Sequence, residues 1–184
     1  MTRAAMGSGA VDTDDFRRVL GHFATGVTVV TGCADGSPVG FACQAFAAVS
    51  LDPPLVLFCP GRASRTWPVI ERSGRFCVNV LSAGQRELSH RFGSRGVDKF
   101  AGVAWSPSPG GAPVLDGVLS WVDAEIETVH VAGDHHVVIG RVTDLGDGTR
   151  DRPLLYYRGG YAATEGVAPA GAAFLPWLRD DSWL

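Results

Sequence analysis

The chain has 184 residues, 46% of them hydrophobic and 19% charged, and its formal net charge is −3. This composition excludes a largely disordered chain and gives no reason to expect a nucleic-acid partner. No apolar run has the length needed to span a membrane, and residues 1–11 lack the apolar segment of a signal peptide. We therefore expect a globular cytoplasmic protein with a flexible leader (1–11), one domain (12–162) and a C-terminal tail (163–184).

The first elements are a short helix and a hairpin. Apolar residues recur at helical spacing over 12–21, where Asp12 or Thr13 can cap the helix. Alternating valine and threonine over 27–31 predicts a strand, and 34–37 is a turn signal before the next strand begins at Pro38.

The most informative stretch is 40–60. It runs as a strand into small residues, turns at Asp52-Pro53-Pro54 and resumes as an apolar strand over 55–59. Small side chains let a flat molecule lie close to the backbone. Gln44 and Ser50 are almost the only polar side chains before the turn, so backbone N–H groups would do most of the hydrogen bonding. Taken alone, the residues favour a buried hairpin of a β-barrel over a binding site.

A second candidate site follows at 61–68. Ser64 can cap a helix that continues to about Arg72, and Arg62 and Arg65 flank it. The pattern is typical either of a capped helix or of an anion site at a helix N-terminus, and the residues do not separate the two.

The remainder is predicted as further strands and one helix. A buried strand covers 75–81, and a capping box at Ser82 to Gln85 opens a helix toward Phe92. A loop is expected at 105–113, then a long strand over 118–129, its return at 135–144 and a last strand at 154–157. The long strand is expected to place Asp123, Glu125 and Glu127 on one face, together with Trp121. Many short strands with few helices predict a mainly β fold, a barrel with peripheral helices.

Several kinds of site are not expected. Cys33, Cys43, Cys59 and Cys77 lack metal-ligand spacing and are predicted to be free thiols of a reducing cytosol, with no metal bound. No G-x-G-x-x-G fingerprint precedes a helix, so a Rossmann domain for a dinucleotide is excluded.

Six segments, in this order, resemble the flavin reductase-like family, and together they span roughly 12–162. They are 23–31, 40–56, 78–81, 99–100, 133–135 and 153–157. The resemblance implies an FMN-binding split β-barrel that dimerises. It also implies an NADH-dependent enzyme, with NADPH less favoured, that reduces FAD or FMN for a separate oxygenase acting on an aromatic, steroid-derived or natural-product substrate. The run 40–44 and the terminal Trp183-Leu184 resemble reductases paired with actinobacterial aromatic-ring hydroxylases of steroid breakdown.

The same resemblance implies which residues form the site. Flavin contacts are expected from Ala42, Cys43, Gln44, Ala45, Phe46, Ser50, Phe58, Cys59, Pro60, Ser64, Arg65, Arg91, Phe92 and Lys99. NADH contacts are expected from His135, the candidate catalytic residue, with Val39 and Tyr161. The family often has Thr at 42 and Ser or Asn at 44, so Ala42 and Gln44 are departures, and backbone contacts should carry more of the binding. The alternatives are a non-catalytic flavin- or haem-binding protein on the same fold, or an enzyme like pyridoxamine-phosphate oxidase.

Overall fold

The fold is built mainly from β-strands, as the sequence predicts. The computed structural model describes residues 11–165, and the expected leader and tail lie largely outside this range. The helices are α1 (Thr13–Leu20), α2 (Trp67–Ser73) and α3 (Arg86–Gly93), with a 3-10 turn η1 (Ala83–Gln85) before α3. The strands are β1 (Thr25–Gly26), β2 (Thr28–Ala34), β3 (Ser37–Cys43), β4 (Phe46–Leu51), β5 (Pro54–Phe58), β6 (Arg75–Val80), β7 (Trp105–Pro107), β8 (Pro113–Leu115), β9 (Ser120–Ala132), β10 (His135–Asp147), β11 (Leu154–Tyr157) and β12 (Gly160–Ala163).

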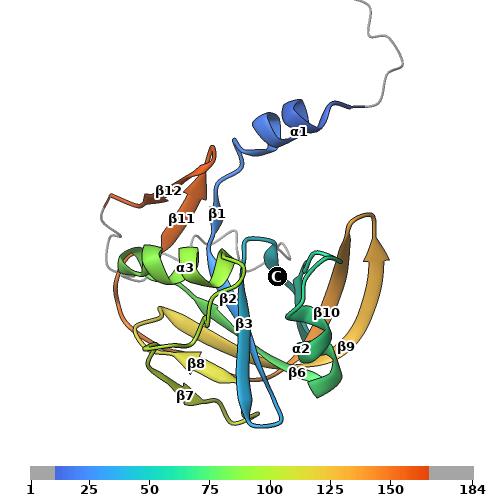
Figure 1. Ribbon diagram of the computed structural model, residues 1–184, viewed down its shortest axis with the longest axis vertical. Helices are drawn as coiled ribbons and strands as arrows, with labels where there is room; N and C mark the ends of the chain where they lie inside the picture. The colour runs from blue at the N-terminus through green and yellow to red at the C-terminus, as the bar shows by residue number, and fades with distance from the viewer. Residues whose placement is uncertain (1–10, 166–184) are drawn as a thin grey trace, which may run out of the picture.

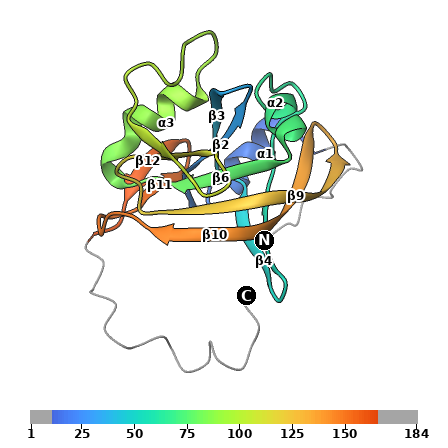
Figure 2. The same ribbon diagram turned by 90° about the horizontal axis from the view of Figure 1, so that it is seen from below.

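A seven-stranded antiparallel sheet forms the body of the molecule (Figures 1 and 2). Its order is β3-β2-β6-β9-β10-β5-β4, so β3 and β4 are its two edges. Only Gln44 and Ala45 separate these strands in the chain, and Cys59 N–H donates to the Ala45 carbonyl at 3.1 Å. Because two residues span so short a distance, the sheet must curl until its two edges meet at this point.

Aromatic rings fill the inside of this sheet. Phe58 has no exposed surface and lies edge-on to Phe76 and Trp67, with centroid distances of 4.8 and 5.7 Å. Gly140 on β10 accommodates the Phe76 ring, because a Cβ there would lie 2.3 Å from the ring. Side chains on the inner face of these strands thus pack into one buried cluster, and a second buried cluster forms around Val29, Leu81 and Phe92.

A clamp of three residues joins α3 to β3. The Phe92 ring packs on Gly40, where an added Cβ would lie 2.8 Å from the ring. The Lys99 ammonium donates to the carbonyls of Gly40 and Phe92 at 3.1 and 2.8 Å, and burial lowers its pKa. Gly40 is therefore needed for close packing of the helix on the strand.

The structure corrects three expectations about the elements. A two-stranded hairpin, β7 and β8, occupies part of the expected loop at 105–113, and β12 follows the strand expected to be the last. Asp123, expected on the polar face of β9, is 1% exposed, and it accepts the Gly110 N–H at 2.7 Å. Burial raises the pKa of Asp123, an effect partly offset by that hydrogen bond. The β7–β8 hairpin thus covers a position that alternation alone assigns to solvent.

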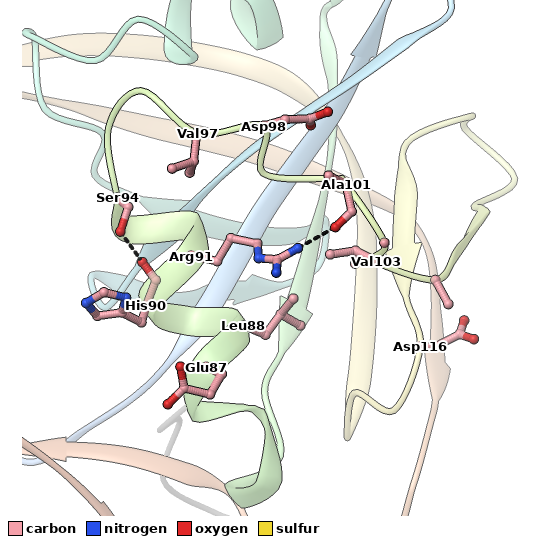
Figure 3. A pocket seen from close by; sticks show the side chains of 12 residues that line it. Glu87, Leu88, His90, Arg91, Ser94, Val97, Asp98, Ala101, Val103 and Asp116 are labelled. Carbon is pink, nitrogen blue, oxygen red and sulfur yellow. Dashed lines mark hydrogen bonds between the residues drawn. The ribbon is translucent and has the colours of Figure 1, made fainter.

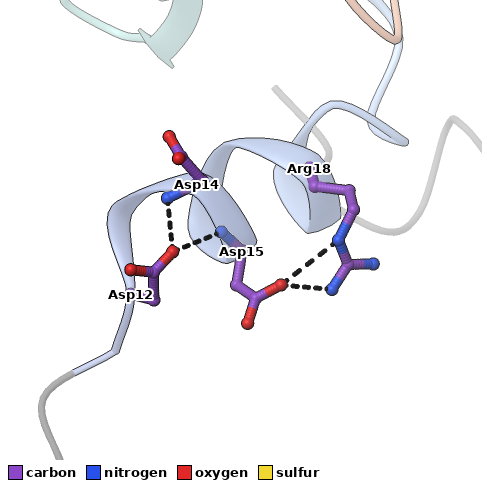
Figure 4. A network of polar contacts seen from close by, with 4 residues as sticks. All are labelled: Asp12, Asp14, Asp15 and Arg18. Atoms are coloured by element: carbon purple, nitrogen blue, oxygen red, sulfur yellow. Dashed lines mark hydrogen bonds and ion pairs between the residues drawn. The ribbon is translucent and has the colours of Figure 1, made fainter.

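Helix α1 stands apart from the sheet (Figure 1). Asp12 caps it as predicted, accepting the N–H groups of Asp14 and Asp15 at 2.9 and 3.1 Å (Figure 4). None of its residues is buried, although its apolar side chains lie on one face. No helix of residues 11–165 is both long and apolar enough to cross a membrane.

Candidate active site

A small cavity forms where the two sheet edges meet. We call it the inner cavity. Its volume is about 310 Å³, and its lining residues are Phe41, Ala42, Cys43, Gln44, Ala45, Cys59, Pro60, Gly61 and His135. Seven of the predicted site residues therefore come together, although they belong to three separate stretches of the chain. Antiparallel pairing of β5 with β10 brings His135 to the 40–60 stretch.

Two residues that line this cavity have backbone N–H groups without a backbone partner in the described range. The N–H groups of Gln44 and Ala45 lie between β3 and β4, and within residues 11–165 neither donates a backbone hydrogen bond outside regular elements. The neighbouring Phe46 and Cys59 N–H groups are used, by the carbonyls of Gln44 and Ala45. Free N–H groups at the open edge of a sheet can donate hydrogen bonds to oxygen or nitrogen atoms of a ligand. That the backbone, rather than side chains, carries most of the binding stays a prediction.

His135 is held at the mouth of the inner cavity. His135 forms an isolated antiparallel β-bridge with Gly61. Two flanking hydrogen bonds of 2.9 Å join Arg62 N–H to the Asp134 carbonyl and His136 N–H to the Pro60 carbonyl. Its Nδ1 lies 2.8 Å from Asp134, and this hydrogen bond lowers the pKa of the Asp134 carboxyl. The His135 side chain is 49% exposed, so its ring is oriented yet open to a ligand.

His136 points the other way, as strand alternation predicts. Its ring packs against Trp67 with a centroid distance of 6.0 Å. In the described range no cluster of three or more His, Cys, Asp and Glu side chains could hold a metal ion. The two histidines therefore lie on opposite faces of β10.

The two cysteines of the inner cavity form a neutral wall. Burial raises the pKa of Cys43 to about 11 and also raises that of Cys59. Both thiols are protonated at neutral pH and are poor nucleophiles. All four cysteines are free, as predicted.

A second, more polar cavity adjoins the inner one. We call it the middle cavity; its volume is about 340 Å³. It shares Ala42, Cys43 and Gln44 with the inner cavity, and its other walls are Val27, Ser89, His90, Gly93, Ser94, Tyr156 and Tyr161. Tyr161 donates to or accepts from Ser89 at 2.9 Å here.

The three residues expected to contact NADH are therefore not gathered together. Tyr161 lines the middle cavity, whereas His135 lines the inner one. Val39 lines neither, because it packs against the core from β3. Of the three, His135 alone lines the inner cavity.

Four of the polar and cationic residues expected to contact the flavin lie next to or within two helices, α2 and α3, that flank β3. Ser64 and Arg65 precede α2, whereas Arg91 and Lys99 belong to α3 and the loop after it, and Figure 1 shows the two helices flanking β3. Ser64 accepts the Trp67 N–H at 3.1 Å, so it supports the first turn of α2, which begins later than predicted. The Arg91 guanidinium donates to the Ala101 carbonyl.

Besides Ser64, Arg65 and Lys99, three more of the predicted flavin contacts line none of the described cavities: Ser50, Phe58 and Phe92. Phe58 and Phe92 have no exposed side-chain surface, and both serve the core instead. Ser50 pairs with Leu55 near the turn of the β4–β5 hairpin, which projects from the body (Figure 2). Phe46 lines an apolar groove next to the inner cavity, together with Gln44 and Ala45. The family resemblance alone does not distinguish a residue that contacts a flavin ring from one that packs in the hydrophobic core.

Sequence reasoning missed Ser89, His90 and Ser94. They are polar residues of α3 and its end, and they lie at i, i+1 and i+5 without a familiar spacing. The only sequence signal was the capping box that predicts the helix itself. Which side of that helix faces β3 is decided by Phe92 packing on Gly40.

Comparison with known proteins agrees with the predicted resemblance. The family described as "Flavin reductase like domain" matches residues 20–165. The chain is 54% identical over 177 residues to a flavin-dependent monooxygenase reductase subunit, HsaB, of Rhodococcus jostii, covering 96% of this chain and 89% of that protein. It is 41% identical over 160 residues to a flavin reductase (NADH) of Kitasatospora aureofaciens, covering 84% and 83%.

Solved structures give the same result. Nitrilotriacetate monooxygenase component B of Mycobacterium thermoresistibile is 55% identical, with a TM-score of 0.81 and coverage of 86% of this chain and 90% of that one. The NADH:FAD oxidoreductase SgcE6 of Streptomyces globisporus is 32% identical, with a TM-score of 0.78 and coverage of 88% and 100%. With its family match, its fold and the inner cavity in agreement, the chain belongs to the flavin reductase-like family.

Proposed function

We propose that this chain is an NADH-dependent flavin reductase that supplies reduced FAD or FMN to a separate flavin-dependent oxygenase. The observation that carries this proposal is the inner cavity, which is lined by His135 together with Gln44 and Ala45, two residues whose N–H groups have no backbone partner among residues 11–165. The relatives named as monooxygenase reductase subunits support the transfer to an oxygenase. An aromatic, steroid-derived or natural-product substrate of that oxygenase remains part of the proposal.

The residues present fit a flavin ring. The walls of the inner cavity are small or flat, and Gln44 and Ala45 offer donors to the polar edge of a ring. When bound, the flavin supplies the site with a hydride acceptor. The two N–H groups would stabilise negative charge at the edge of the ring as it is reduced, because fixed donors need no reorganisation.

His135 would position the nicotinamide dinucleotide. Asp134 holds the imidazole through Nδ1, which leaves Nε2 on the side of Gly61. No protein nucleophile is required for hydride transfer, so protonated Cys43 and Cys59 suit the site. NADH is proposed as the donor, with NADPH less favoured.

The enzyme should oxidise NADH only when a flavin is added. Purified protein with FAD or FMN, under air, is expected to lose NADH absorbance at 340 nm, a wavelength that reports the cofactor. The same protein without flavin should show no loss. If NADH were consumed neither after addition of FAD nor after addition of FMN, the proposal would be contradicted. That outcome would favour a non-catalytic flavin- or haem-binding protein, or an enzyme like pyridoxamine-phosphate oxidase.

We also propose that the chain is a homodimer in which a second copy covers α1. Phe16, Leu20 and Phe23 of this segment are more than half exposed and line an apolar groove of about 1060 Å³. An eight-residue helix with no buried side chain is not stable in water by itself. Light scattering should give twice the chain mass of 19.4 kDa.

A paired substitution tests the dimer surface. Phe16→Ser should shift the mass toward that of one chain, since it removes an apolar contact, whereas Arg18→Ser should not. A wild-type mass of one chain would contradict the dimer. The domain limits 12–162 and the cytoplasmic location stay predictions, the latter supported by four free cysteines.

A further inference from the structure

Two neighbouring rings carry buried nitrogens that have no partner. Trp67 Nε1 and His136 Nδ1 are both buried, and neither makes a hydrogen bond among residues 11–165. The two rings pack against each other with a centroid distance of 6.0 Å and an interplanar angle of 39°. An unpaired buried polar atom is unfavourable, so such atoms usually have a partner in a folded protein. Two of them on adjoining rings call for a common explanation.

Polar groups elsewhere in the protein have partners where they are needed. A cavity of about 770 Å³ lies between α3 and the loop that follows it (Figure 3). There the Arg91 guanidinium donates to the Ala101 carbonyl, and the Ser94 hydroxyl donates to the His90 carbonyl at 2.8 Å. Within residues 11–165, no buried side-chain atom that lacks a partner belongs to the lining of this cavity. A missing partner is therefore specific to a few positions.

The two nitrogens have complementary hydrogen-bonding chemistry. The indole N–H of Trp67 can only donate, whereas Nδ1 of a neutral imidazole accepts when Nε2 carries the hydrogen. The two atoms do not bond to each other, and one water molecule between them would satisfy both. Trp67 is 2% exposed, so such a water would be a buried one.

This pair of rings lies directly behind the inner cavity. His136 follows His135 on β10, and strand alternation places His135 at the cavity and His136 against Trp67. The His136 N–H also donates to the Pro60 carbonyl at 2.9 Å, and Gly61 forms a β-bridge with His135. A displacement of the His136 ring therefore also moves the backbone that carries His135.

The segment before α2 connects Trp67 to the same wall of the inner cavity. The Trp67 N–H donates to the Ser64 hydroxyl at 3.1 Å, and the Ser64 N–H donates to the Gly61 carbonyl at 2.9 Å. The Trp67 ring is also held from the core, because it lies edge-on to Phe58. A link from Trp67 to His136 would join the start of α2 to the start of β10 through side chains as well as through the backbone.

We propose that Trp67 and His136 are positioning residues for His135, joined by one buried water molecule that accepts from Trp67 Nε1–H and donates to His136 Nδ1. The inference rests on the proposed reductase function, in which His135 positions the nicotinamide dinucleotide. Neither Trp67 nor His136 lines the inner cavity, so the pair acts on the dinucleotide only through His135. It therefore affects the KM for NADH and leaves the flavin site unchanged.

Substitutions that keep the rings and remove the nitrogens test the positioning role. His136→Phe and Trp67→Phe should each raise the KM for NADH about fivefold, because the His135 ring loses part of its orientation. The kcat and the dissociation constant of the flavin should stay within about twofold of wild type. The double variant should be no worse than either single variant, since both remove the same link.

A conservative variant and a control separate positioning from general damage to the hairpin. His136→Asn keeps an acceptor oxygen near the position of Nδ1, and its KM for NADH should lie within about twofold of wild type. The control is His22→Phe. His22 also packs edge-on to an aromatic ring, that of Tyr157 at 6.4 Å, but lines none of the described cavities, and its substitution should leave the KM unchanged.

Nuclear magnetic resonance tests the water itself. The chain has five tryptophans, and the indole N–H signal that disappears in Trp67→Phe identifies that of Trp67. In the wild type and in His136→Asn, this proton should show a nuclear Overhauser effect to water. In His136→Phe the effect should be lost, because the water has no acceptor to hold it.

The two measurements separate this inference from the proposed function. An unchanged KM in His136→Phe, a raised KM that His136→Asn shares, or a wild-type Trp67 N–H without a water signal would overturn the inference while leaving the reductase function intact. Failure of the wild-type protein to oxidise NADH with either FAD or FMN would overturn the proposed function, and the positioning role with it.

Discussion

Replacing Phe58 with alanine is expected to lower the free energy of unfolding by about 3–5 kcal/mol. The ring has no exposed surface and lies against Phe76, Trp67 and Phe41, with centroid distances of 4.8, 5.7 and 6.2 Å. Its removal leaves a cavity among rings held by several strands, and such a cavity cannot collapse completely. Denaturant unfolding followed by tryptophan fluorescence measures the loss, because Trp67 is in the cluster.

Two controls separate packing from ligand binding at this position. Phe58→Leu keeps most of the volume and should cost about 1–2 kcal/mol. Phe46→Ala, at a partly exposed ring of the apolar groove, should cost less than Phe58→Ala. If Phe58→Ala unfolded like wild type yet bound flavin weakly, the side chain would be a ligand contact and its assignment to the core would be wrong.

Replacing His135 with alanine is expected to raise the KM for NADH about tenfold, which corresponds to about 1.4 kcal/mol. The ring is half exposed, is oriented by Asp134 at 2.8 Å and borders the inner cavity. Loss of one charge-oriented polar contact has this size. Steady-state rates at saturating flavin give the KM, and fluorescence quenching gives the flavin affinity, which should stay within about twofold of wild type.

The matched control is His130→Ala. His130 is an exposed histidine of the same β9–β10 hairpin and lines none of the described cavities. Its KM for NADH should equal that of the wild type. The KM for NADH of Asp134→Asn should lie between those of His130→Ala and His135→Ala, because this substitution weakens the orientation of the His135 ring but leaves the ring in place. An unchanged KM in His135→Ala would make this histidine a structural residue of the hairpin.

The local elements follow from the sequence because their causes are local. Capping at Asp12, the capping box from Ser82 to Gln85 and the turn at Asp35-Gly36 each depend on residues within a few positions. The predicted strands at 27–31, 75–81 and 118–129 also appear, since alternation and β-branched residues act over the same short range. The family motif at 40–56 includes several residues that line the inner cavity, and it can be recognised from neighbouring residues alone.

What the tertiary structure decided is which face of each element meets which neighbour. The resemblance implied that Phe58 and Phe92 contact the flavin, yet the curl of the sheet and the clamp to Gly40 turn both rings into the core. Asp123 follows the polar alternation of its strand and is nevertheless buried, because the β7–β8 hairpin folds over it. Tyr161 and His135 line two different cavities that share Ala42, Cys43 and Gln44, and Ser64 precedes α2 whereas Lys99 follows α3, the two helices that flank β3. These placements depend on contacts between residues distant in the chain, and no local pattern of side chains records them.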